Sequence, residues 1–461
     1  MSARSTATLE SIVARLERLP FLPAHLRVAM ILAGGTFFDA FDSVTIGIVL
    51  TVIIASFKIT FVTAGLLISG GYVGQFIGAV TFGVLAERYG RKPAFVWTLA
   101  IFGGFSLLAA FATNFQSLLI LRVLQGIGLG AEVPVAGALI NELVRGATRG
   151  RVIMAYESAF TWGLAATPIL GGALISSLGP DRGWRTMFLL GSIPIAIAAI
   201  AARALPESPR WLASRGRVSE AETIVMALES EARARGTQLP DMPPVPPVAI
   251  KPTSLNEMFS PMYSRRTILS WTQWFTTYFT VYGYTVWLPL LYVRVGGLQP
   301  SHAIALTIIP GFAQVAVAYT ISATIDRVGR KIWFAGGFAV AFAAMAIGAV
   351  LVSVLGLHGW PVLFWVGLFT AMGTGANAIG VYLYTPELFP TRMRAWATST
   401  GSAANRIASV IAPIVVGALL GRGLGIAAVF GTFALVLLIG LIVMLTLGIE
   451  TKNRLLEELS P

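Results

Sequence analysis

The strongest constraint on this chain is a series of long apolar stretches, each separated from the next by a short polar or Gly/Pro-rich turn. An α-helix needs ~20 apolar residues to cross the hydrocarbon core of a bilayer, and each stretch is about that long. Because 56% of the 461 residues are hydrophobic and only 12% are charged, the chain has too little charge to cover a water-soluble surface of this size. The sequence therefore predicts an all-α membrane protein with twelve transmembrane helices at residues 28–52, 61–85, 94–112, 117–140, 152–178, 186–204, 267–292, 302–325, 332–355, 360–384, 395–420 and 424–448.

The apolar stretches fall into two sets of six, with a long hydrophilic segment between them. Residues 240–252 of that segment are rich in proline, which is typical of a linker, and residues 218–235 predict a short surface helix. We therefore expect three parts. An N-terminal six-helix bundle covers 1–204, a cytoplasmic loop covers 205–266, and a C-terminal six-helix bundle with a short cytoplasmic tail covers 267–461.

Lysine and arginine side chains predict the orientation of these helices. Most of the 33 such residues fall in tails and loops on one side of the predicted membrane, whereas the other side has Lys58, Arg182, Arg185, Arg294 and Arg422. The positive-inside rule then places both termini in the cytoplasm of a multi-pass protein of the inner (plasma) membrane. The first apolar run is long enough to span, so we expect no cleaved signal peptide. This sorting also accounts for the net charge of +12 without nucleic-acid binding.

The residues that usually form metal, thiol or nucleotide sites are either absent from the sequence or not spaced as such a site requires. The chain contains no cysteine, and His25, His302 and His358 lack the spacing of a metal site. It also contains no phosphate-binding loop, so ATP is not expected to supply energy. We therefore expect no metal, no cofactor and no enzymatic activity.

A polar loop motif occurs twice in the chain. Residues 87–92 (Glu-Arg-Tyr-Gly-Arg-Lys) lie between the second and third predicted helices, and residues 326–331 (Asp-Arg-Val-Gly-Arg-Lys) lie between the eighth and ninth. A glutamate followed seven residues later by an arginine also occurs in both halves, at Glu142/Arg149 and Glu387/Arg394. Such an internal repeat predicts two pseudo-symmetric bundles that face each other across a central path.

These repeated motifs resemble those of major facilitator superfamily transporters, and the resemblance covers essentially the whole chain. Residues 206–212 (Pro-Glu-Ser-Pro-Arg-Trp-Leu) are similar to a mark of the sugar and organic-ion transporter branch. Residues 128–136 (Gly-Leu-Gly-Ala-Glu-Val-Pro-Val-Ala) and 156–158 (Tyr-Glu-Ser) resemble bacterial nicotinate transporters. Residues 38–42 (Phe-Asp-Ala-Phe-Asp) resemble the Asp-Gly-x-Asp motif of aromatic-acid/proton symporters, with alanine in place of glycine. The resemblance implies a secondary transporter of twelve helices.

Charged residues near the two loop motifs are candidates for a gate. Glu142 and Arg149 are predicted to lie two turns apart on one helical face, so each would pair with a neighbouring helix. We hypothesise a salt-bridge latch that holds when the transporter faces outward and breaks when it faces inward. The alternative is static anchoring of the loops by charge at the membrane surface. The candidate gate residues are Glu87, Arg88, Arg91, Glu142, Arg149, Asp326, Arg327, Arg330, Glu387 and Arg394.

Few ionisable residues fall inside the predicted helices, and a charge there costs at least ~2.5–3.5 kcal/mol. Counting ~1.5 Å per residue places Asp39 near the midplane and Asp42 one turn further out, at a depth comparable with Arg122. Asp42 and Arg122 can therefore pair. Resemblance to proton-coupled sugar carriers implies that this pair takes up and releases the coupling proton, with Asp39 as competitor or relay. The alternative is a permanent ion pair that joins two helices. Glu132 is a further proton-coupling candidate, although hydrogen bonding between helices explains it as well.

Arg406 lies near the midplane of the predicted eleventh helix, in the second half of the chain. A guanidinium stays charged and can hold a carboxylate with two parallel hydrogen bonds. Among related organic-ion carriers, the resemblance implies that arginine in this helix marks anion transporters. The alternative is that Arg406 neutralises a carboxylate of the protein itself.

The seventh predicted helix carries an aromatic stripe at Trp274, Tyr278 and Tyr282, which are spaced i, i+4, i+8. Such a stripe could stack a planar ring of the substrate, although the same spacing is also typical of ordinary packing. The other substrate-binding candidates are Gln273, Trp162, Gln314, Asn377, Tyr382 and Asp39.

Together with the resemblance to nicotinate transporters and aromatic-acid symporters, the sequence predicts proton-coupled uptake of a small organic anion, an aromatic or heteroaromatic carboxylate such as nicotinate. Sugar or another neutral metabolite is the alternative substrate, although the seventh helix lacks the paired glutamines of sugar porters. A sensor that binds the solute without moving it, and uncoupled facilitation, remain rival functions. We expect a monomer in the lipid bilayer, with protons and the anion as its partners.

Overall fold

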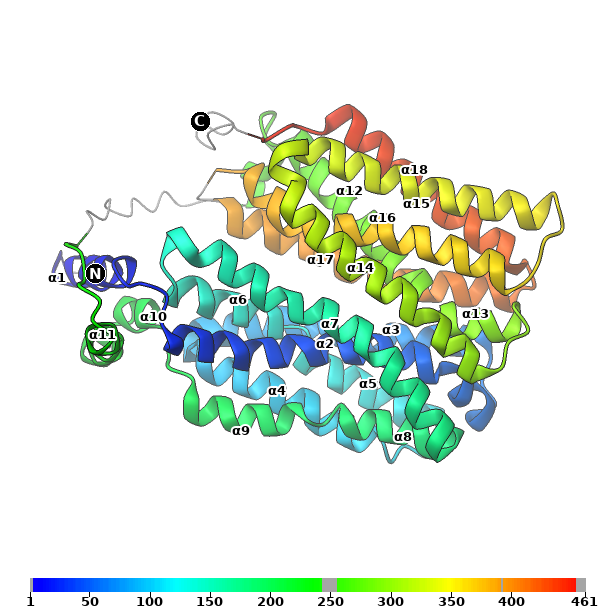
Figure 1. Cartoon of the computed structure of the whole chain (residues 1–461), viewed down its shortest axis with the longest axis horizontal. Helices are drawn as coiled ribbons and strands as arrows, with labels where there is room; N and C mark the ends of the chain where they lie inside the picture. Colours follow the sequence, from blue (N-terminus) through cyan, green and yellow to red (C-terminus); the bar gives the residue numbers. More distant parts are fainter. Residues whose placement is uncertain (1–2, 243–254, 391–392, 453–461) are drawn as a thin grey trace.

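The computed structural model describes residues 3–242, 255–390 and 393–452. Within these residues the secondary structure is helical, without a β-strand. Long helices lie side by side in two groups, one from each half of the chain, as Figure 1 shows. Helices α2 to α9 form the first group, and α12 to α18 form the second.

The first five predicted spans are all present in the first half. Four of them are single helices, and one is a pair of shorter helices in sequence. These are α2 (Pro23–Phe57), α3 (Phe61–Tyr89), α4 (Arg91–Ala109), α5 (Phe115–Leu129) followed by α6 (Glu132–Leu143), and α7 (Gly146–Leu178). The sixth span is built by α8 (Pro180–Leu190) and α9 (Pro194–Ala204). The predicted limits of this span, 186–204, were too short because α8 begins directly after Gly179, whose φ is +79°.

The second half repeats this arrangement. It consists of α12 (Ser264–Thr280), the π-helical turn η2 (Val281–Thr285), α13 (Leu288–Arg294), α14 (Pro300–Val328), α15 (Arg330–Ser353), α16 (Trp360–Glu387), α17 (Arg394–Gly421) and α18 (Gly425–Leu447). Of the described helices, 11 are long and apolar enough to cross a membrane. The predicted span 267–292 is not among them, because η2 divides it into shorter pieces. The chain is therefore a multi-pass membrane protein.

One detail of the predicted gate is wrong. Glu142 and Arg149 do not share a helical face, because Glu142 lies near the end of α6 and Arg149 lies in the first turns of α7. Val144 (ψ 137°) and Arg145 (ψ 148°) are extended and separate the two helices. Each residue still contacts a partner outside its own helix, Arg91 for Glu142 and Glu17 for Arg149.

Besides the short 3₁₀-helix η1 (Leu255–Phe259), which precedes α12, three short helices lie outside the membrane-spanning set and form what we call the cap. They are α1 (Ala3–Glu17), α10 (Pro209–Ser214) and α11 (Val218–Ala234), of which the last matches the predicted surface helix 218–235. Ile12 and Leu16 pack with Trp211 and Val225 in a small apolar core of their own. Figure 1 places the cap at one end of the helix bundle, which we call the terminal face; the opposite end is the far face.

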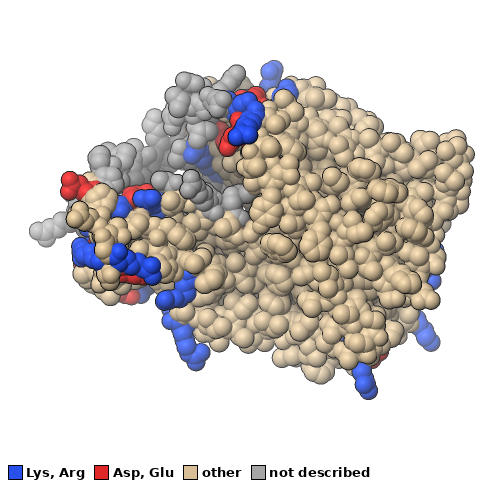
Figure 2. Space-filling model, viewed as in Figure 1, with Lys and Arg blue, Asp and Glu red and all other residues tan. Residues whose placement is uncertain are grey.

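Charge is distributed along the molecule as expected for a membrane protein. Figure 2 shows Lys and Arg gathered at the terminal face, a few at the far face, and a broad belt without charge between them. The belt exposes large apolar side chains such as Val84, Ile347 and Leu445. Lipid chains cover such a surface without cost, whereas water does not.

The two halves meet through close contact of α3 with α17 toward the far face. An added Cβ on Gly65 would lie 2.7 Å from the carbonyl oxygen of Pro413, and one on Gly417 would lie 2.5 Å from that of Phe61. The hydroxyl of Ser69 donates to the carbonyl oxygen of Val410 at 2.7 Å. Small residues let helices approach this closely in a membrane. Toward the terminal face, Figure 1 shows the two groups of helices diverging.

Candidate functional site

Asp42 on α2 and Arg122 on α5 form a buried ion pair. Arg122 Nη1 lies 2.6 and 2.8 Å from the two carboxylate oxygens of Asp42. Gln125, which the sequence analysis did not single out, closes the group: its Nε2 donates to Asp42 and its Oε1 accepts from Arg122, both at 2.8 Å. All three side chains are buried. Gln125 could have been found, because it lies one turn from Arg122 on the same face of the helix.

Arg406 on α17 is also buried, but its partner is neutral. Its Nη1 donates to the amide oxygen of Gln75 on α3, and its Nε is buried without a partner. No carboxylate of the described residues forms an ion pair with Arg406. Gln75 is a second residue that the sequence analysis did not single out, since a lone neutral amide in an apolar helix gives no charge signal.

Asp39 lies between these two groups. It is buried on α2, one turn from Asp42, and has no hydrogen-bond partner among the described residues. The charges of Arg406 and Asp42 act on it most strongly. The carboxylate of Asp39 is therefore available for a proton or a new partner.

The predicted aromatic stripe on the seventh span forms a continuous stack. The rings of Trp274 and Tyr278 lie 5.7 Å apart at 21°, and those of Tyr278 and Tyr282 lie 5.7 Å apart at 20°. Tyr72 on α3 extends the stack across to the first half, with its ring 4.8 Å from that of Tyr282. Tyr382 on α16 contacts Trp274 edge to face at 4.7 Å. Three rings of the stripe are buried, whereas Tyr382 is half exposed.

Glu132 is buried at the start of α6 and accepts a hydrogen bond from Thr36 on α2 at 3.2 Å. Gly35 makes room for it, because an added Cβ there would lie 2.6 Å from Glu132 Oε1. This contact links two helices of the first half.

Four other predicted substrate residues contact helices outside this group. Gln273 donates to Met444 Sδ on α18 at 2.8 Å, and Asn377 lies against Gly337 on α15. Gln314 packs on Gly375, and the half-exposed Trp162 contacts Phe312. The structure does not bring these four residues into contact with Arg406.

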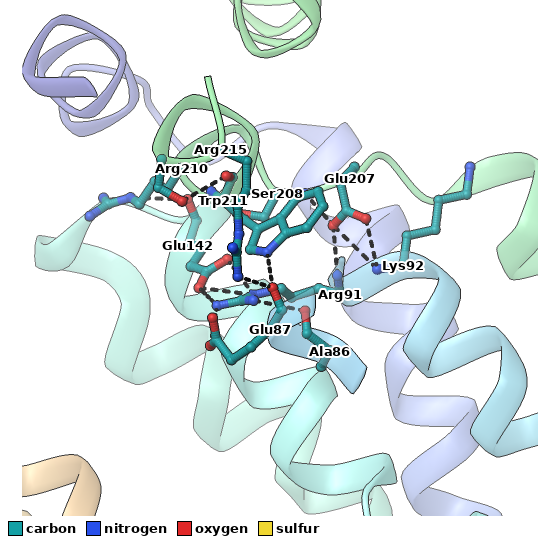
Figure 3. Close-up of polar contacts among 11 residues, drawn as sticks. Ala86, Glu87, Arg91, Lys92, Glu142, Glu207, Ser208, Arg210, Trp211 and Arg215 are labelled. Carbon is teal, nitrogen blue, oxygen red and sulfur yellow. Dashed lines mark hydrogen bonds and ion pairs between the residues drawn. The ribbon is translucent and has the colours of Figure 1, made fainter. Parts of the chain in front are cut away.

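On the terminal face, the first loop motif is a dense network of ion pairs (Figure 3). The guanidinium of Arg91 contacts Glu142 and Glu87, each at 2.8 Å. Glu207, between α9 and α10, accepts from the backbone N–H of Arg91 at 2.9 Å and also from that of Lys92. Gly90 permits this approach with a φ of +113°, and an added Cβ would lie 2.1 Å from Glu207 Oε2.

The second loop motif repeats this network. Arg330 contacts Asp326 at 2.7 Å and Glu387 at 2.9 Å. Glu450 accepts from the backbone N–H of Arg330 and of Lys331, each at 3.0 Å, beside Gly329. Glu207 and Glu450 therefore have equivalent roles. Each carboxylate caps the N-terminus of the helix that follows its motif, α4 for Glu207 and α15 for Glu450.

The remaining gate candidates have partners near their own motifs. Arg149 contacts Glu17 of the cap at 3.4 Å and the carbonyl oxygen of Val144 at 3.1 Å. Arg394 donates to the carbonyl oxygen of Phe389, Arg88 lies over the ring of Tyr89, and the carbonyl oxygen of Arg327 accepts from Lys452.

Glu17 of the cap also belongs to this network, although the sequence analysis did not include it among the candidate gate residues. It accepts from Arg210 at 2.7 Å and from the N–H of Gly146 at 2.8 Å. Burial disfavours its charge, but these partners outweigh burial and hold the pKa of Glu17 below its usual value.

Comparisons with known proteins agree with this architecture. The family model "Sugar (and other) transporter" matches residues 28–461. The chain is 34% identical to the niacin transporter NiaP of Acinetobacter baylyi, over 97% of this chain and 99% of that one. It is 31% identical to the 4-hydroxybenzoate transporter PcaK of Pseudomonas aeruginosa, over 67% and 68% of the two chains.

Among solved structures, the inward-open xylose transporter XylE from E. coli superimposes with a TM-score of 0.73 at 17% identity, over 94% of this chain and 99% of that one. At this identity the likeness concerns the fold alone. The relatives and neighbours are transporters and not enzymes. The chain therefore belongs to the sugar (and other) transporter family of the major facilitator superfamily, as its repeated loop motifs predict.

Proposed function

We propose that this protein takes up a small organic anion together with protons, and that the anion is an aromatic or heteroaromatic carboxylate such as nicotinate. The observation that carries the proposal is Arg406, a buried cation in the membrane-spanning part whose hydrogen-bond partner is a neutral amide. A carboxylate would give this guanidinium two charge-assisted hydrogen bonds in place of a neutral one. Such an exchange favours an anionic substrate over a sugar.

The aromatic groups near Arg406 support a planar substrate. The aromatic stripe packs against α17, the helix that carries Arg406: Trp274 lies against Gly401, and Tyr382, which contacts Trp274, is half exposed. A planar ring could lie against these side chains while its carboxylate meets Arg406. Two relatives of the chain, a niacin transporter and a 4-hydroxybenzoate transporter, fit this class of substrate.

The acids of α2 are our candidates for proton coupling. Asp42 is tied to Arg122 and Gln125, whereas Asp39 has no hydrogen-bond partner among the described residues. When a substrate carboxylate neutralises Arg406, Asp39 loses that countercharge and binds a proton more readily. Proton uptake by Asp39 would thus accompany substrate binding, with Asp42 and Arg122 as a second site that moves with α2.

The proposal includes an orientation and a gating cycle. The terminal face, which is rich in Lys and Arg, lies in the cytoplasm of a cell with the protein in its inner membrane. In the described residues, each ion pair of this face joins partners within one half or its cap. The pairs Arg91–Glu142 and Arg330–Glu387 are intact although the two halves diverge at this face, so a latch that opens in an inward-facing carrier has to consist of other contacts, formed between the halves.

The test is transport of radiolabelled nicotinate into proteoliposomes that contain the purified protein. We expect accumulation driven by an inwardly directed proton gradient and abolished by a protonophore. Exchange of labelled for unlabelled nicotinate without a gradient separates a carrier from a sensor, because a sensor shows none. Xylose in place of nicotinate tests the neutral-substrate alternative. Gradient-independent equilibration would leave a carrier but exclude proton coupling, and the absence of both uptake and exchange would refute the proposal.

A further inference from the structure

The pairing of Arg406 with Gln75 is unusual for a buried arginine. A guanidinium has five N–H donors, and a neutral amide oxygen satisfies few of them. Arg122, in the first half, instead contacts both carboxylate oxygens of Asp42. Arg406 is one of the charged groups in the surroundings of Asp39, yet no ion pair forms between them. Gln75 therefore holds Arg406 where a carboxylate partner would be expected.

The location of this pair is informative. Contacts between α3 and α17 run in antiparallel order from the far face inward: Phe61 with Gly417, Gly65 with Pro413, Ser69 with Val410, and then Gln75 with Arg406. Gln75 and Arg406 are thus the innermost of these contacts. A ligand that takes over Arg406 removes one connection between the two halves at the inner limit of their closed interface.

The backbone of Gln75 is fixed within the first half. An added Cβ on Gly74 would lie 2.0 Å from the carbonyl oxygen of Val123, and one on Gly130 would lie 1.9 Å from that of Gln75 itself. An added Cβ on Gly78 would lie 2.0 Å from the carbonyl oxygen of Ile127, so α3 and α5 touch through their backbones on both sides of Gln75. Only the side chain of Gln75 can move away from Arg406 without separating these helices.

We propose that Gln75 is a stand-in for the substrate carboxylate, whose amide oxygen binds Arg406 in the empty carrier and yields this place when the anion arrives. The inference rests on the proposed function, in which Arg406 binds a carboxylate. Gln75 is then a positioning residue, because it acts through Arg406. It gives the guanidinium one acceptor without adding a charge, so Asp39 stays available for a proton while the site is empty.

This role predicts that Gln75 competes with the substrate, so its replacements shift affinity in opposite directions. In a Gln75→Met variant the guanidinium has no acceptor in the empty state, and we expect nicotinate to bind at least about fivefold more tightly. In a Gln75→Glu variant the new carboxylate pairs with Arg406, and we expect nicotinate to bind at least about tenfold more weakly. Nicotinamide has the same ring but no charge, so its affinity should change little in either variant.

The experiment measures the dissociation constant of nicotinate by calorimetry for the parent and both variants in detergent, with the melting temperature as a check of folding. A Gln75→Met protein that melts like the parent but binds nicotinate equally or more weakly would overturn the inference. If that variant does not fold, the Gln75→Glu variant tests the inference instead. An affinity for nicotinate equal to that of the parent would then overturn it. A parent protein that binds no carboxylate at all refutes the proposed function instead, which distinguishes the two failures.

Discussion

Two arginines lie buried in the membrane-spanning part of this transporter, one in each half, and their partners differ. Arg122 contacts both oxygens of a carboxylate and shares a glutamine with it, whereas Arg406 contacts a glutamine alone. An ion pair with all partners in place resists exchange, because breaking it leaves a buried charge. A cation held by a neutral amide can exchange that amide for an anion. We infer that Arg122 stays paired with Asp42 within the first half, whereas Arg406 of the second half can bind an anion from outside the protein.

The largest effect should follow from breaking the complete ion pair. We expect Arg122→Ala to destabilise the protein by about 3–5 kcal/mol, because it leaves the carboxylate of Asp42 buried and unpaired. The measurement is unfolding of the purified protein in detergent by heat and denaturant. The double variant Arg122→Gln with Asp42→Asn removes both charges and should recover most of the lost stability. If the single and double variants were equally unstable, the pair would not be the stabilising element.

Replacing the second arginine should affect transport rather than folding. Because two charge-assisted hydrogen bonds to a carboxylate are lost, we expect Arg406→Gln to lower nicotinate uptake about 100-fold. The melting temperature should stay near that of the parent, since Gln75 loses only one hydrogen bond. Arg406→Lys keeps the charge without the planar fork and should retain an intermediate rate. Parental uptake by Arg406→Gln would mean that the anion binds elsewhere.

The contrast between the two arginines also marks the limit of what the sequence predicted. The number of spans follows from hydrophobic length, and the depths of Asp42 and Arg122 followed from a fixed rise per residue, so their pairing was foreseeable. Gln75 was not, because a neutral amide carries no charge cost that would flag it. The break in the seventh span was also missed, since nothing in residues 267–292 gives a π-helical turn a distinct signal.

Residues that close the loop motifs were missed for another reason. Glu207 lies in the motif at residues 206–212, but the partners of Glu207 and Glu450, the backbone N–H groups of Arg91 and Arg330, are far away in the sequence. A pattern of charged residues in the sequence predicts which side chains need a partner in the fold. It does not predict which backbone N–H groups will lie within hydrogen-bonding distance. The predicted latch residues therefore gather where expected, while the acids that cap α4 and α15 emerge from the three-dimensional arrangement.

A smaller effect is expected at the loop motifs, where the two halves are alike. Arg91 and Arg330 are buried at the terminal face, but each contacts one exposed carboxylate, Glu87 or Asp326, which water can solvate when the arginine is removed. We expect Arg91→Ala and Arg330→Ala to lower nicotinate uptake severalfold, and to similar extents, at normal expression. Lysine at either position should restore part of the rate. A parental rate in both alanine variants would favour static anchoring over a latch.

The smallest effect concerns the cap, which has no counterpart among the described residues of the second half. A hydrogen bond from Arg15, helped by Arg18 and opposed by burial, lowers the pKa of Glu229 to about 2. A depressed carboxyl pKa stabilises the docked cap fully above the ordinary value of 4.5, and this stabilisation is lost as the pH falls toward 2. The hydrogen-exchange protection of α1, which is the exchange rate corrected for the intrinsic pH dependence of amide exchange, should therefore be constant from pH 7 to about 5 and fall below that. Glu229→Gln should exchange rapidly at every pH, whereas Glu220→Gln, which alters an exposed pair with Arg217, should behave like the parent. Acid-insensitive protection of α1 in the parent would show that the apolar contacts of Ile12 and Leu16 hold the cap without Glu229.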